Sequence, residues 1–200
     1  MVDERGATQL GRDGRADDPN DGRLNLAMLD VMKEDQRRGP DFGGPELDML
    51  LGYLAYERDT LLWKLDGLDD EQLRRPHQPS GLTLLGIIKH LTDVERSWVR
   101  GIVGGEDIRH YWDPADPQRY WRIEPDDTTA AIIAGYRAEG DQADAIIRER
   151  GLDAGVSFVR DEAEKDMTVR WVVIHLVEET ARHVGHADLI RETIDGATGE

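Results

Sequence analysis

Residues 169–192, VRWVVIHLVEETARHVGHADLIRE, carry the pattern that decides the fold. Their spacing predicts one long amphipathic helix, because positions three and four residues apart lie on the same face of an α-helix. The members of this face are Val172, Leu176, Glu179, His183, Ala187 and Ile190. Most of them are apolar, so we expect the face to point into the core, where Glu179 and His183 interrupt it. Thr168 can cap this helix, which we expect to continue to about Asp195.

The same periodicity predicts three further helices upstream. The first covers about residues 45–68 and starts at a proline, which is favoured in the first turn of a helix. The second covers about residues 80–101, with Ser80 as its candidate cap, and the third about residues 126–150. Because four long amphipathic segments occur without a convincing strand pattern, we expect an all-α fold, a four-helix bundle.

The remaining segments are predicted as loops and a leader. Residues 1–24 are rich in Gly, Asp and Arg and are expected to be a disordered leader, followed by a short helix and linker over residues 25–44. Residues 103–125 form a long, aromatic-rich crossover loop between the second and third helices. Residues 151–167 are expected to be a second long loop, so the bundle domain covers residues 45–196.

Composition limits the chemistry and the partners of the chain. Its formal net charge is -17 and it has no cysteine. Without thiols there are no disulfides, cysteine nucleophiles or thiolate ligands, so a metal must be held by His, Asp or Glu. The acidic balance disfavours nucleic acid and anionic membranes. We find no signal-peptide pattern, apolar membrane span, nucleophilic-serine elbow, phosphate loop or dinucleotide motif, and we expect a soluble cytoplasmic protein.

A metal site is predicted from polar residues that interrupt apolar stripes. On the second predicted helix, His90 lies in a stripe with Ile87 and Val94. A buried carboxylate such as that of Glu179 costs several kcal/mol unless it is paired or bound to a metal. Glu179 and His183 are four residues apart and can reach one ion, and His90 from a facing helix can complete the set. Two histidines and one carboxylate form a common open site for zinc, ferrous iron or nickel.

The same residues have other interpretations. Glu179 and His183 can be a hydrogen-bonded surface pair, and His90 a histidine satisfied by its neighbours. His175, one turn before Glu179, offers an alternative ligand row, but three ligands on consecutive turns of one straight helix span too far to converge on one ion. We therefore expect His175 in the pocket wall and His186 as a group that caps or wets the pocket. The crossover loop adds three aromatic pocket candidates, which either roof the site or hold their own loop in place: Tyr111, Trp112 and Trp121.

Two stretches carry a family resemblance. PSGLTLLGIIKHLTDVERSW (residues 79–98) and residues 169–192 resemble the DinB-like superfamily, and most closely an actinobacterial subgroup related to mycothiol-dependent S-transferases and maleylpyruvate isomerases. The resemblance covers about residues 45–195. It implies a four-helix bundle of DinB type with a crossover connection, often dimeric, and a zinc or nickel ion. In that family the ion is held by a histidine of the second helix and an H-x-x-x-H pair of the fourth.

The resemblance also implies which residues bind and what they do. His90 matches the ligand of the second helix, and His183 matches the last ligand of the fourth. Glu179 stands where the family has the first histidine of the pair, as in the maleylpyruvate isomerases, which use two His and one Glu. The resemblance thus implies a metal-dependent enzyme that conjugates a thiol, mycothiol first, to a small electrophile, with zinc expected before nickel or iron.

Two alternative functions remain open at this point: a mycothiol-dependent isomerase, and a non-catalytic bundle that binds a metal or ligand. The expected partners are a small-molecule substrate, a low-molecular-weight thiol and a second copy of the chain in a homodimer. The absence of cysteine is compatible with a thiol that arrives as a cosubstrate.

Overall fold

The computed structural model describes residues 37, 39–77, 79–108, 115–116, 118–160 and 163–198. The chain divides into Met1–Gln36 and Arg37–Glu200, and only the second unit is described here. The predicted leader, most of the short helix and linker that follow it, and the pocket candidates Tyr111 and Trp112 lie outside the described residues.

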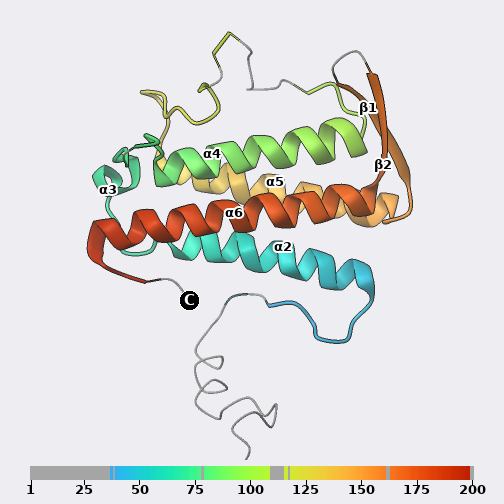
Figure 1. Ribbon diagram of the computed structural model, residues 1–200, viewed down its shortest axis with the longest axis horizontal. Coiled ribbons are helices and arrows are strands. Elements are labelled where there is room, and N and C mark those ends of the chain that lie inside the picture. The colour runs from blue at the N-terminus through green and yellow to red at the C-terminus, as the bar shows by residue number, and fades with distance from the viewer. Residues whose placement is uncertain are drawn as a thin grey trace, which may run out of the picture. The chain divides into compact units, whose positions relative to one another are not determined.

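The second unit is mostly helical, which confirms the predicted predominance of helix. Its helices are α2 (Glu46–Trp63), α3 (Asp70–Arg74), α4 (Leu84–Glu95), the π-helical continuation η1 (Arg96–Val103), α5 (Thr129–Arg150) and α6 (Val169–Asp195). The four long segments α2, α4, α5 and α6 lie side by side (Figure 1). Helix α6 packs against α2 and α4, and α5 packs against α4 and η1. The apolar faces of these helices form two buried clusters, one toward each end.

The caps of the helices explain where α4 and α6 begin. The Thr168 side chain accepts a hydrogen bond from the Trp171 amide, and Gly196, in the left-handed conformation with φ 77°, ends α6; both ends match the prediction. Helix α4 is capped by Thr83, which accepts from the Gly86 amide, so the prediction of Ser80 as the cap is wrong. Ser80 instead bonds within the preceding turn, where its hydroxyl accepts from the Leu82 amide at 3.3 Å.

The first helix is shorter than predicted. Helix α2 ends at Trp63, and a turn through Gly67 (φ 78°) leads to α3. Leu65 and Leu68 pack into the core from this turn rather than from the helix, which is why their spacing extended the predicted helix too far. Helix α3 starts with a capping box between Asp69 and Gln72, a signal that the sequence already held.

The prediction of a loop over residues 151–167 is wrong. Strands β1 (Gly155–Arg160) and β2 (Ala163–Thr168) form an antiparallel hairpin, with Gly155 opposite Thr168. Among the β1 residues whose burial is described, Val156 is the one that is buried, and the sequence of β2, AEKDMT, is mostly polar, so neither strand shows a strong alternation of apolar and polar residues. The hairpin packs on η1, where the ring of Phe158 lies 5.4 Å from that of Trp98.

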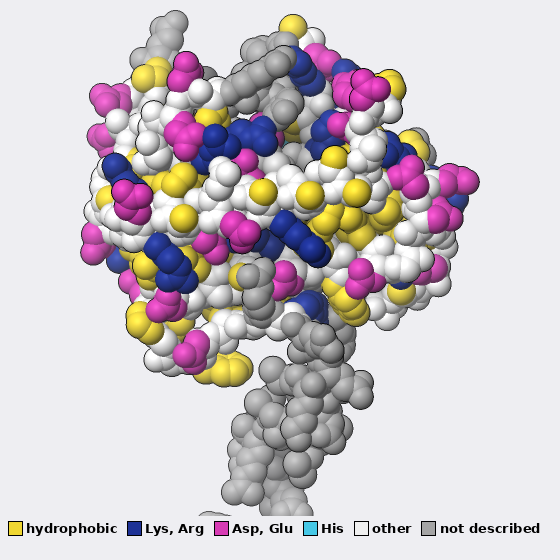
Figure 2. Space-filling model, turned by 180° about the vertical axis from the view of Figure 1, so that it is seen from behind, with side chains coloured by type: hydrophobic (Ala, Val, Ile, Leu, Met, Phe, Trp, Pro, Cys, Tyr) yellow, Lys and Arg dark blue, Asp and Glu magenta, His cyan; other side chains and the backbone are white. Residues whose placement is uncertain are grey.

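Within the described residues, none of the helices combines the length and the apolar character needed to cross a bilayer. On the face shown in Figure 2, Lys and Arg side chains are interspersed with Asp and Glu side chains. The described part of that face therefore has no extended patch of one charge sign.

A buried ion pair joins α2 to α4. Two guanidinium nitrogens of Arg58 donate to the two carboxylate oxygens of Glu95 at 2.8 and 2.7 Å, and a third donates to Asp144 of α5 at 2.9 Å. The Arg58 and Glu95 side chains are only 8% and 1% exposed. Gly140 leaves room for this arginine, because a Cβ at Gly140 would lie 3.2 Å from the guanidinium carbon.

We expect Glu95→Gln to lower the free energy of unfolding by about 3 kcal/mol, because it removes the charge opposite a guanidinium that stays buried. Urea denaturation followed by circular dichroism measures this. The control is Asp48→Asn in the exposed Arg148–Asp48 pair, whose side chains are 51% and 49% exposed and which should matter far less. Equal losses in both variants would contradict the importance of the buried pair.

Candidate metal centre

The three predicted ligands come together between α4 and α6. His90 Nε2 lies 3.2 Å from Glu179 Oε1, and His183 Nε2 lies 3.3 Å from the same oxygen. One ligand atom from each residue lies within 4.8 Å of the other two. Their side chains are 12%, 13% and 8% exposed. Within the described part of the chain, this is the one group of three or more His, Asp or Glu residues close enough to hold a metal ion.

The electrostatics of the site suit a cation. Burial lowers the pKa of His90 from 6.5 to about 4, although its hydrogen bond with Glu179 opposes the shift. Burial also lowers the pKa of His183. For Glu179, burial alone would raise the pKa, but the contacts with His90, His183 and Arg182 outweigh it and lower the pKa. At neutral pH the site thus presents two uncharged imidazoles and one carboxylate, which is a donor set that fits a divalent metal.

Two of the three ligands, Glu179 and His183, are held from outside by a second group. Arg182 donates to Glu179 Oε2 at 2.7 Å, which leaves Oε1 facing the two imidazoles. His186 Nδ1 lies 3.2 Å from His183 Nδ1, so a hydrogen bond on that side leaves His183 Nε2 directed at Glu179. Such outer contacts fix the orientation of a ligand and the nitrogen it presents. His186 therefore contacts a candidate ligand, and its role in capping the pocket stays a prediction.

Aromatic rings cover the histidines. The Trp121 ring stacks on His90, with centroids 3.9 Å apart and planes at 20°, and lies 5.3 Å from the ring of His183. The structure thus brings this predicted pocket residue to the site. Tyr120, whose ring centre is 5.0 Å from that of His90, was not predicted. The sequence offered one indication that Tyr120 belongs to the site, its position next to Trp121. The sequence does not show, however, that both of these loop residues contact the same histidine.

His175 is not part of the ligand group. Its ring lies 4.8 Å from that of Trp98 and stacks on that of Trp171 at 5.3 Å, near the hairpin end of α6. Its Nδ1 is 3.8 Å from Glu178. The structure therefore does not support the alternative ligand row along α6, and a role for His175 in a pocket wall stays a prediction.

The segment that carries Trp121 rests directly on α4. A Cβ at Gly86 would lie 2.6 Å from the Trp121 carbonyl oxygen, so only glycine allows this approach. Lys89 Nζ donates to the Arg122 carbonyl at 2.7 Å and pairs with Asp127 at 2.5 Å. The backbone contact and the lysine together hold Trp121 over His90.

Fold and site together define a helical protein with a buried two-histidine, one-glutamate candidate metal centre. Residues 49–196 match the model of the family described as Mycothiol-S-transferase, and the chain belongs to this family. The match confirms the resemblance to DinB-like, mycothiol-related proteins. No curated protein matches the chain.

We expect Gly86→Ala to raise the pKa of His90 from about 4 toward its ordinary 6.5, because the new methyl group pushes the Trp121 backbone away and lets water reach the imidazole. NMR titration of the metal-free protein measures this value. Gly135→Ala is the control, since a Cβ there meets nothing within 4 Å. A His90 pKa near 4 in both variants would refute the role of Gly86.

Proposed function

We propose that the protein is a metal-dependent S-transferase that joins mycothiol to a small electrophile. The observation that carries this proposal is the buried set of His90, Glu179 and His183 in a chain of the mycothiol S-transferase family. The chain has no cysteine, so the thiol of the reaction is that of the cosubstrate. We also infer that the four long helices form a bundle of the DinB type.

The proposed chemistry divides between the ion and the protein. A divalent metal held by the three ligands, zinc before nickel or iron, would supply positive charge that lowers the pKa of the thiol. Arg182 keeps the carboxylate of Glu179 in position, and Trp121 shields the imidazole of His90 from water. The thiolate sulfur would then form a C–S bond with the electrophilic carbon while the bond from that carbon to its leaving group breaks, and the thiol proton and the leaving group pass to solvent.

A second candidate is a mycothiol-dependent isomerase. Glu179 gives this chain a set of two histidines and one glutamate, which resembles the set expected for maleylpyruvate isomerases. An isomerase returns the thiol unchanged, whereas a transferase consumes it. The homodimer and the cytoplasmic location stay predictions.

We expect Glu179→Ala and His183→Ala each to abolish metal binding, because each removes one of three ligands. Elemental analysis after loading with zinc or nickel and desalting measures the bound metal, and circular dichroism checks the fold. His175→Ala is the matched control: it removes a histidine of the same helix that lies outside the ligand group, and it should retain the metal. Unchanged metal content in both ligand variants would refute the site.

For the wild-type protein loaded with zinc or nickel, we expect mycothiol to be consumed in proportion to a fluorogenic electrophile, because the thiol becomes part of the product. Thiol titration beside product fluorescence measures the ratio. Turnover with the thiol returned unchanged would identify an isomerase instead. No rate above background with any metal, thiol or electrophile tried would leave a non-catalytic binding protein.

A further inference from the structure

Four rings form one cluster where η1, β1 and α6 meet, and we call these four residues the aromatic surface. The ring of Trp98 lies 4.8 Å from that of His175, 5.4 Å from that of Phe158 and 5.5 Å from that of Trp171. His175 also stacks on Trp171, with their planes at 23°. Trp171 is 48% exposed, and the side chain of His175 is 26% exposed. Apolar rings that stay open to solvent in one cluster are typical of a binding site.

The aromatic surface begins next to the candidate metal centre. His175 precedes Glu179 by one turn of α6, which is about 6 Å along the helix axis. On the facing helix, Trp98 follows His90 by two turns. Val94, halfway between them, packs on the same hydrophobic cluster as Trp98, so the surface between the ligands and the rings is apolar on this helix. The ligands and the rings are therefore neighbours along both helices.

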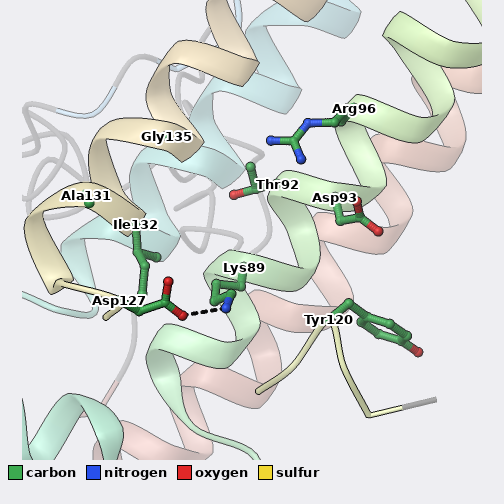
Figure 3. Close-up of a pocket in the computed structure, with 9 residues that line it drawn as sticks. All are labelled: Lys89, Thr92, Asp93, Arg96, Tyr120, Asp127, Ala131, Ile132 and Gly135. Atoms are coloured by element: carbon green, nitrogen blue, oxygen red, sulfur yellow. Dashed lines mark hydrogen bonds and ion pairs between the residues drawn. The ribbon is translucent and has the colours of Figure 1, made fainter. Parts of the chain in front are cut away.

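The opposite side of the candidate metal centre is filled by the protein itself. Toward the start of α4, Trp121 stacks on His90, and the pair of Lys89 and Asp127 holds the segment that carries Trp121 (Figure 3). A polar cavity of about 180 Å³ between α4 and α5 borders Tyr120, but none of the three metal ligands lines it. The rings at the hairpin end, in contrast, remain available to a reactant.

The chemistry of the aromatic surface suits a flat, uncharged ring. Burial lowers the pKa of His175, so its imidazole is uncharged at neutral pH, like the two indoles and the phenyl ring beside it. Aromatic rings attract one another in stacked and edge-to-face arrangements, and the surface already contains both. A planar apolar group would extend this packing. A charged or hydroxyl-rich group would lose its water there without gaining hydrogen bonds.

We propose that the aromatic surface binds the electrophilic substrate, and that this substrate carries an aromatic ring. The inference rests on the proposed function and names the class of its electrophile. The ring lies against Trp171 and His175, and the reactive carbon points along α6 to the candidate metal centre. There the thiol sulfur forms a C–S bond, the bond from that carbon to its leaving group breaks, and the thiol proton and the leaving group pass to solvent.

The test compares two electrophiles that share a reactive carbon and a leaving group, bromide: N-benzylbromoacetamide, which has an aromatic ring, and bromoacetamide, which has none. With mycothiol and the metal-loaded protein, we expect Trp171→Ala to lower the ratio of the two kcat/KM values about tenfold, which corresponds to about 1.4 kcal/mol. Trp171→Leu keeps apolar bulk without the ring and should lower the ratio as well. Trp63→Ala is the control: it removes an indole that is 42% exposed and lies outside the aromatic surface, and it should leave the ratio unchanged.

The outcomes separate this inference from the proposed function. An unchanged ratio in both Trp171 variants, or an equal fall in Trp63→Ala, overturns the electrophile site and leaves the transferase in place. A change in sedimentation caused by Trp171→Ala overturns it too, because the surface would then be an interface between two copies of the chain.

If the wild-type protein turns over neither electrophile, the transferase fails, and binding decides the aromatic surface by itself. The indole N–H signals are then followed by NMR during titration with N-benzylacetamide, which lacks the leaving group. Shifts confined to Trp98 and Trp171 support a site for an aromatic ring. Equal shifts at Trp63, or no shifts at all, refute it.

Discussion

The carboxylate of Glu179 is the group on which the candidate site depends. Its Oε1 lies 3.2 Å from His90 and 3.3 Å from His183, in a place where a bare charge is costly. Burial lowers the pKa of both histidines, so neither imidazole supplies a full positive charge at neutral pH. Arg182 balances the carboxylate only from the outer side, through Oε2. A cation on the inner side would complete the balance and use the lone pairs of both imidazoles.

The rest of the fold serves to bring these groups together from distant parts of the chain. Caps at Thr83 and Thr168 fix where α4 and α6 start, and the apolar faces of these helices bury the ligands between them. The backbone of Trp121 can approach α4 only at Gly86, and this approach places an indole ring on His90. Tyr120, next in the chain, reaches the neighbouring polar cavity. One short segment thus borders both the ligands and the cavity.

A second buried polar interaction, the ion pair of Arg58 and Glu95, lies outside the group of candidate metal ligands. Arg58 and Glu95 join α2 to α4 with two short hydrogen bonds, and Asp144 of α5 adds a third contact. Such a pair is strongly sensitive to the loss of one partner, because the other charge remains buried. It ties together three of the helices whose relative positions set the distance between His90 and α6. The stability of the helical fold and the geometry of the site are therefore linked through α4.

The sequence by itself predicted the four long helices, apart from their exact ends, and placed His90, Glu179 and His183 on apolar faces, because helical periodicity depends only on residues three and four positions apart. Helix spacing argued against a ligand row that includes His175, and the family resemblance then selected His90 and His183. Tertiary structure decided which groups meet: the pairing of Arg58 with Glu95, the contact of Gly86 with Trp121, and the hairpin of β1 and β2, which the spacing of apolar residues did not predict. The first two contacts join residues far apart in the chain, so they form only when the helices pack against one another.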